Sequence, residues 1–187
     1  RRQRDAVGLT TFSENVEIYT PAKSTMAHHK FLFNQMETYL NADPDSNKTS
    51  AVDAMHQIAE RLHRRSLIVV LSDMFDNSDK QDELFSALQR LKFNKHEVIL
   101  FHITDKQTEL DFDLENRPYT FVDTETGEQV KAHPNEIRDT YLAQMDKFMK
   151  ELKLKCGQYG IDFVEADISK GFNDILLQYM IKRKKLF

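Results

Sequence analysis

Residues 66–77 of the chain read SLIVVLSDMFDN. Residues 67–71 are all apolar and rich in β-branched side chains, which predicts a strand buried on both faces of a sheet. The apolar run ends at Ser72 and Asp73, at the carboxyl end of the expected strand. In open α/β sheets, ligands and metals bind at this edge. Asp73 is therefore either a functional carboxylate or a residue that caps the following loop.

Strand and helix signals alternate along the chain. Strands are expected at 6–12, 16–20 (ended by Pro21), 66–72, 97–104, 119–123, 128–132 and 161–166. Helices are expected at 25–40, 50–62, 80–92, 134–159 and 173–182. Strands separated by helices of this length imply parallel crossovers, so we expect an α/β fold, a three-layer α/β/α sandwich with a mostly parallel sheet. One domain is expected over residues 1–187.

Composition excludes several classes of protein. A net charge of −4 gives no reason to expect nucleic acid, and no apolar run approaches the roughly 20 residues that span a bilayer. The single cysteine, Cys156, excludes an internal disulfide framework and fits a reducing compartment, so we expect a cytoplasmic protein. The chain begins RRQRD, like the last turn of a helix, without an initiator Met. We expect it to be an N-terminally truncated fragment of a longer protein.

One residue pair suggests a metal site. Thr49 closes a polar loop just before the helix expected at 50–62, and Asp73 follows the next strand. In a right-handed strand–helix unit, both side chains can meet at the carboxyl edge of the sheet. A hydroxyl and a carboxylate are hard oxygen ligands that suit Mg²⁺ or Mn²⁺. The alternatives are a helix N-cap for Thr49 or Ser50 and a loop hydrogen bond for Asp73.

Enzyme signatures are weak. Asp73, Asp76 and Asp105 could gather along one sheet edge, as in a metal-dependent phosphoryl-transfer enzyme, but such enzymes need a second acidic motif. The sequence has five glycines, no phosphate-binding glycine loop and no Gly-x-Ser-x-Gly motif. His56, Glu60 and His63 share one helix face without the usual zinc signature, so we expect that face to be solvated. We expect that the chain is not an enzyme.

Several sequence blocks together resemble one family. In order they are RDAVGLTTFS (4–13), LIVVLSD (67–73) followed by Phe75-Asp76, HEV (96–98), FVDTETGE (121–128) and GIDF (160–163). The set resembles the DUF58 family, whose members have a von Willebrand factor A-like domain. No single block would identify the family, but the ordered set spans essentially the whole chain.

The resemblance implies a Rossmann-like, von Willebrand factor A-like sheet with a metal-ion-dependent adhesion site. Such a site is built from Asp-x-Ser-x-Ser, a later Thr and a later Asp. Thr49 would be the Thr, with Ser50 a near substitute, and Asp73 the Asp. The Asp-x-Ser-x-Ser element follows the first, central strand in such domains and is absent from this chain. The resemblance thus implies that this fragment lacks the first central strand, and that Mg²⁺ or Mn²⁺ binds the intact protein.

The resemblance also implies a role. DUF58 proteins are associated with MoxR-type AAA+ ATPases as adaptor or chaperone-like partners, so we expect a protein-interaction module that binds a protein partner. A metal-dependent phosphoryl-transfer enzyme and a metal-free scaffold are the alternatives. The unpaired edges left by a missing strand would favour self-association of the fragment.

Overall fold

A parallel sheet of three strands forms the centre of the molecule. The structure is a computed structural model that describes residues 5–12, 16–41, 51–62, 65–74, 81–93, 95–122 and 127–184. Strand β4 (Glu97–Thr104) lies between β3 (Leu67–Ser72) and β7 (Asp162–Asp167). In register, Val70 faces Leu100, which faces Phe163 on the other side. The observed bounds agree with the expected strands to within one residue.

Two antiparallel hairpins form separate sheets. They are β1 (Val7–Phe12) with β2 (Val16–Lys23), and β5 (Tyr119–Val122) with β6 (Gln129–Ala132). The expectation that the second strand ends at Pro21 was wrong, because β2 continues to Lys23. The register shifts between Val7 and Leu9, and a Cβ atom on Gly8 would lie 2.7 Å from the Thr20 carbonyl oxygen. Because Gly8 has no side chain at this irregularity, β1 can approach β2 closely at Pro21 and the pairing continues beyond the proline.

Five helices in the described ranges follow the expected pattern. They are α1 (Met26–Leu40), α2 (Ala51–Arg61), α3 (Gln81–Phe93), α4 (Pro134–Tyr159) and α5 (Phe172–Lys184). Helix α4 has proline in its first turn and ends at Gly160, whose φ of 68° is left-handed, so both ends carry the expected signals. Two short turns were not expected, a π-helical turn at Lys106–Leu110 and a 3₁₀ turn at Ile168–Lys170.

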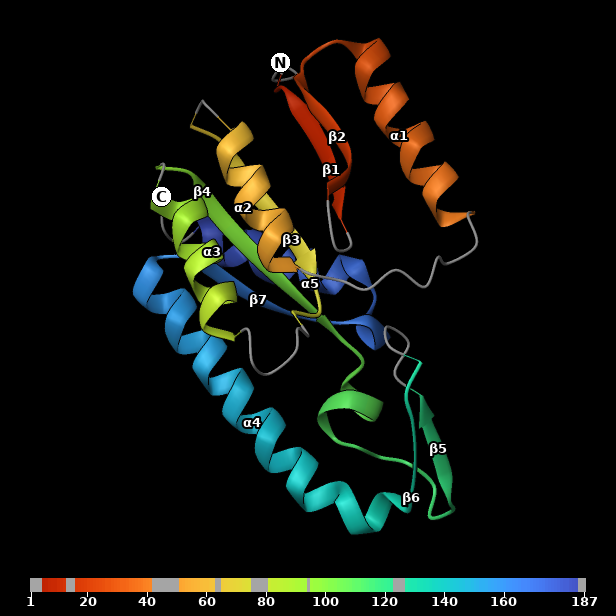
Figure 1. Cartoon of the computed structure of the whole chain (residues 1–187). Coiled ribbons are helices and arrows are strands. Elements are labelled where there is room, and N and C mark those ends of the chain that lie inside the picture. The colour runs from red at the N-terminus through yellow and green to blue at the C-terminus, as the bar shows by residue number, and fades with distance from the viewer. Residues whose placement is uncertain are drawn as a thin grey trace.

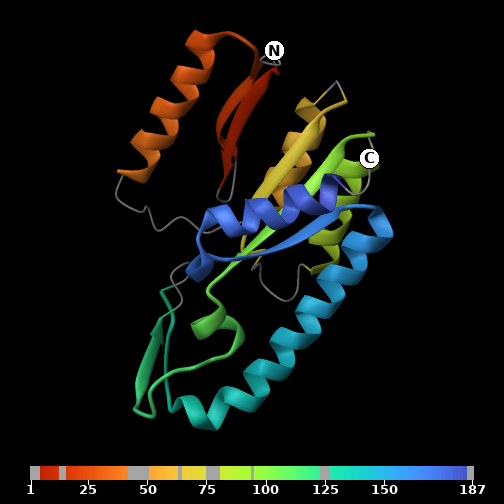
Figure 2. The same cartoon turned by 180° about the vertical axis from the view of Figure 1, so that it is seen from behind.

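Helices cover both faces of the three-stranded sheet. The larger core lies on the face of α2, α3 and α4, and includes Met55, Val70, Leu84, Leu88, Leu100, Leu152 and Cys156. A smaller core lies under α5 and is built from Ile99, Phe101, Ala166 and Tyr179. Figures 1 and 2 show these layers from opposite sides, with α1 beside the β1–β2 hairpin and apart from the sheet. The expected three layers are present in the described residues.

Strand β3 is not buried on both faces, which corrects the expectation from its sequence. Val70 points into the larger core, but Leu67, Val69 and Leu71 are 51%, 49% and 65% exposed. Among the described strands, β3 pairs only with β4 and so forms an edge of the sheet. Helix α5 contacts β7 and packs on Ile99 and Phe101 of β4, which leaves the same face of β3 uncovered.

Within the described ranges, no helix combines the length and apolar character that crossing a bilayer requires.

Candidate functional site

The carboxyl end of β3 presents Asp73 through a tight backbone turn. The Met74 backbone N–H donates a hydrogen bond to Ser72 Oγ at 3.0 Å. Met74 has a φ of 56°, a conformation that is uncommon for any residue except glycine. Its side chain is nevertheless only 1% exposed and belongs to the larger core. The buried Met74 side chain thus anchors the turn in the larger core, while Asp73 is exposed at the sheet edge.

A buried histidine supports this turn from the next strand. His102 of β4 is 0% exposed, pairs in register with Ser72, and lies against the rings of Phe148 and Phe163. Burial lowers the pKa of His102, opposed by the negative charge of Asp73 and by a hydrogen bond to the Asp73 backbone. His102 is therefore a core histidine that lies beside the end of β3.

The end of β4 brings two more carboxylates to this edge. Asp105 caps the π-helical turn, because its Oδ1 accepts a hydrogen bond from the Gln107 N–H at 3.0 Å. The Asp105 N–H in turn donates to Glu109 Oε2 at 3.2 Å. Burial raises the pKa of Glu109, and the negative charges of Asp73 and Asp105 raise it further. Glu109 therefore lies close enough to Asp73 and to Asp105 for their negative charges to act on it.

The last parallel strand also ends in an aspartate. Asp167 is buried and accepts hydrogen bonds from the Ser169 N–H at 3.1 Å and the Ser169 hydroxyl at 2.7 Å. Hydrogen bonding to the Ser169 side chain is the main cause that lowers the pKa of Asp167, so this carboxylate is held ionised. Each strand of the parallel sheet is thus followed by, or ends in, an aspartate.

Sequence reasoning found part of this edge. It placed Asp73 and Asp105 at strand ends, and the structure brings both to the same edge. It missed Asp167, because the last strand was expected to stop one residue earlier, and it missed Glu109, because no pattern predicted the π-helical turn. The remaining candidates, Thr49, Ser50 and Asp76, lie outside the described residues. Within the described part of the chain, no three His, Cys, Asp or Glu side chains form a group that could hold a metal ion.

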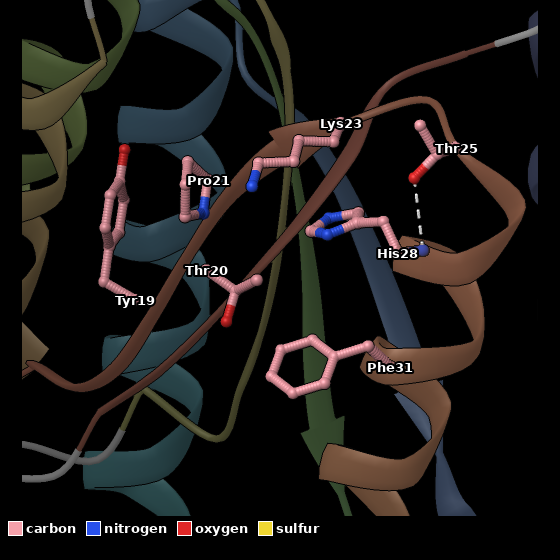
Figure 3. A pocket seen from close by; sticks show the side chains of 7 residues that line it. All are labelled: Tyr19, Thr20, Pro21, Lys23, Thr25, His28 and Phe31. Carbon is pink, nitrogen blue, oxygen red and sulfur yellow. Dashed lines mark hydrogen bonds between the residues drawn. The ribbon is translucent and has the colours of Figure 1, made fainter.

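A second feature is a hollow of about 530 Å³ between β2 and α1, shown in Figure 3. Two of its polar side chains form hydrogen bonds between the hairpin and α1: the His28 ring donates to the Val7 carbonyl at 2.9 Å, and the Thr20 hydroxyl donates to Gln35 Oε1 at 2.9 Å. These bonds hold α1 on the hairpin, so we treat the hollow as part of the helix packing. The lining residues are Tyr19, Thr20, Pro21, Lys23, Thr25, His28 and Phe31.

Comparison with known families identifies the chain. A family model described as "Protein of unknown function DUF58" matches residues 1–150. The chain belongs to the DUF58 family. The match confirms the resemblance seen in the sequence blocks. The matched range contains Asp73, Asp105 and Glu109 but ends before Asp167. No curated protein and no solved structure matches this DUF58 chain.

Proposed function

We propose that this DUF58 protein is a protein-interaction module that binds a protein partner through a divalent cation at the carboxyl edge of its sheet. The observation that carries the proposal is Asp73, an exposed carboxylate on a turn anchored by buried Met74. A partner surface can reach a carboxylate in this position directly. In adhesion sites of this type, the cation completes its coordination with a carboxylate of the partner, so the bound surface would be acidic.

The chemistry of the edge suits Mg²⁺ or Mn²⁺. Carboxylate oxygens are the ligands that these hard cations prefer. The charges of Asp73 and Asp105 raise the pKa of Glu109, and a cation at the edge would relieve that repulsion. In the proposed site, Asp73 would hold the cation as a protein ligand, and Thr49, two positions before α2 in the sequence, would supply a hydroxyl ligand. The neighbouring acidic side chains would strengthen the field that attracts the cation.

The proposal includes a von Willebrand factor A-like arrangement, with the implied first central strand between β1 and β3. Two observations support this placement. Among the described strands, β1 pairs only with β2 and β3 only with β4, while α2 contacts both the hairpin and the larger core. The exposed row of Leu67, Val69 and Leu71 is also the apolar surface that a neighbouring strand and its covering elements would bury.

The partner we propose is a MoxR-type AAA+ ATPase or its client, in the cytoplasm. Family membership supports the choice of partner, and Cys156 supports the compartment. Cys156 is fully buried, and burial raises the pKa of its thiol to about 11, so it is an unreactive thiol of the kind found in reducing compartments.

Calorimetric titration with Mg²⁺ and Mn²⁺ tests the cation site. We would titrate this 187-residue chain, a longer chain that includes the upstream strand, and the Asp73→Ala variant of the longer chain. We expect the longer chain to bind and the variant to lose binding, because the variant lacks the ligand at the end of β3. The matched control is Asp139→Ala, which removes an exposed carboxylate of α4 and should bind normally.

Capture of a purified MoxR-type ATPase tests the partner. The longer chain should retain the ATPase in the presence of Mg²⁺, and both Asp73→Ala and a chelator should release it. If the longer chain binds no cation, the metal-dependent mechanism is wrong. Capture that persists in Asp73→Ala would show that the partner binds elsewhere on the module.

A further inference from the structure

Helix α1 carries an apolar stripe of exposed side chains. Met26, Phe33 and Leu40 are 72%, 68% and 86% exposed, and Met36 is 39% exposed. Together with His29, they lie at positions 26, 29, 33, 36 and 40, so the spacing alternates between three and four residues and repeats every seven. This is the pattern of a helix that packs against another helix in a coiled coil. We call Met26, Phe33, Met36 and Leu40 the outer stripe.

The outer stripe has no part in holding α1 on the hairpin. A neighbouring face of the helix does so, through buried Leu32, the bond between Thr20 and Gln35, and the bond between His28 and Val7. Figures 1 and 2 show α1 at the periphery, on the side of the hairpin away from the three-stranded sheet. The outer stripe is therefore accessible, and its four large side chains form an exposed apolar surface.

We propose that the outer stripe packs against the outer stripe of a second copy of this chain, with the two α1 helices antiparallel. A two-fold axis between Phe33 and Met36 would place Phe33 of each copy against Met36 of the other. The same surface then serves both copies, as a two-fold interface requires. This interface is independent of the proposed cation site, which lies at the carboxyl edge of the parallel sheet.

Charge favours this occupant and this direction. Lys30 and Glu37 are both exposed. Lys30 directly follows His29 and Glu37 directly follows Met36, which are equivalent positions of the repeat, so both charges flank the outer stripe on the same side. In the antiparallel pair, Lys30 of one copy lies beside Glu37 of the other, and the two-fold axis creates this pair twice. In a parallel pair in register, Lys30 would instead lie beside Thr25 and Glu37 beside Leu32, and neither of these neighbours carries a charge. Within one helix they are seven residues apart, too far to pair with each other.

The interface is small. Helix α1 has 15 residues and is therefore about 22 Å long. Such a surface lies at the low end of specific interfaces, so association should be weak and depend strongly on concentration.

Sedimentation equilibrium over a range of protein concentrations up to about 1 mM, where weak interfaces become populated, tests the proposal. The average mass of the chain should rise from the 22.0 kDa of one copy towards twice that value. Phe33→Glu should remain monomeric, because it places a charge at the centre of the stripe. The matched control is Leu154→Glu on α4, which changes a side chain of similar exposure (60%) away from α1 and should associate like the unmodified chain. Circular dichroism would confirm that both variants are folded.

Charge reversal tests the antiparallel register. Lys30→Glu or Glu37→Lys alone should weaken association by about tenfold, because each replaces two attractive pairs by two repulsive ones. The double variant K30E/E37K should restore it, since the reversed pairs attract again. A chain that stays at 22.0 kDa throughout overturns the proposal, as does association that Phe33→Glu leaves unchanged. Loss of association in Phe33→Glu without rescue in the double variant overturns the antiparallel pair.

Discussion

Strands β3 and β4 lie side by side in one sheet and have similar apolar sequences, yet their burial differs. In β4, the residues from Val98 to His102 are at most 5% exposed. In β3, every second side chain is about half exposed or more, namely Leu67, Val69 and Leu71. The difference comes from their neighbours. Strand β4 has a strand on each side and helices over both faces, whereas among the described elements β3 has one neighbouring strand and no helix over its outer face. An apolar run shows that the side chains of a strand can be buried, but the neighbouring strands and helices determine which of them are.

The largest expected effect comes from the same substitution in the two strands. Leu100 is 0% exposed and Leu71 is 65% exposed. Leu100→Ala should lower the free energy of unfolding by about 3 kcal/mol, through lost burial and the cavity left behind. Leu71→Ala should lower it by less than about 1 kcal/mol, because its side chain is mostly solvated already. Urea unfolding of both variants measures the two effects.

The same pair of variants also tests the proposal that a further strand pairs with β3. If the proposed further strand lies beside β3 in a longer chain, the cost of Leu71→Ala should rise there towards that of Leu100→Ala. An unchanged cost in the longer chain would mean that β3 stays uncovered there too.

The buried histidine of β4 makes stability depend on pH. Burial lowers the pKa of His102 below its ordinary 6.5, so near and below that pH the unfolded chain binds more protons than the folded chain. The free energy of unfolding should therefore fall as the pH drops from 7 through 6.5 towards the lowered pKa. His102→Phe should flatten this dependence. Because burial also lowers the pKa of His96, part of the slope should remain in that variant.

The ends of β3 and β4 should interact electrostatically across the edge. Asp73→Asn removes one of the charges that raise the pKa of Glu109, so that pKa should decrease while the effect of burial remains. A carbon-detected NMR titration of the Glu109 carboxyl group measures the change. Asp139→Asn on α4 is the control and should leave the Glu109 pKa unchanged. If the two variants behave alike, Asp73 and Glu109 are not coupled.

The smallest expected effect lies on the solvated side of α2. Glu60 Oε1 and Arg90 Nη2 form an ion pair at 2.9 Å, with side chains that are 62% and 49% exposed. Glu60→Gln should lower the free energy of unfolding by less than about 0.5 kcal/mol, because water screens exposed pairs. Leu88→Ala, on the buried side of α3, should cost several times more. A large loss from Glu60→Gln would show that the pair is part of the packing between α2 and α3.

Local patterns were sufficient to predict most of the secondary structure. The strand at Glu97–Thr104 and the helix at Pro134–Tyr159 have the bounds that their sequences predicted, because alternation, helical spacing and end signals act over a few residues. The continuation of β2 through Pro21 could not be predicted in this way. It depends on Gly8, which lies in the partner strand.

The candidate site also combines residues that local sequence predicts with residues that only the folded chain brings to the edge. Asp73 and Asp105 were recognisable because each follows an apolar run that ends abruptly. Glu109 was not, because its place at the edge depends on a π-helical turn and on the Asp105 N–H that it accepts from. Asp167 could have been found by extending the last expected strand by one residue.

The sequence by itself determined the order of strands and helices, the membership of the DUF58 family and the position of Asp73 at a strand end. Only the tertiary structure decided that β3 is an edge among the described strands, that Met74 anchors the turn beside Asp73, and that the outer stripe of α1 is exposed. The physical reason is that hydrogen-bonding and spacing patterns are local properties of a chain. Burial and the electrostatic coupling of charges depend on residues that are distant in sequence and adjacent in space.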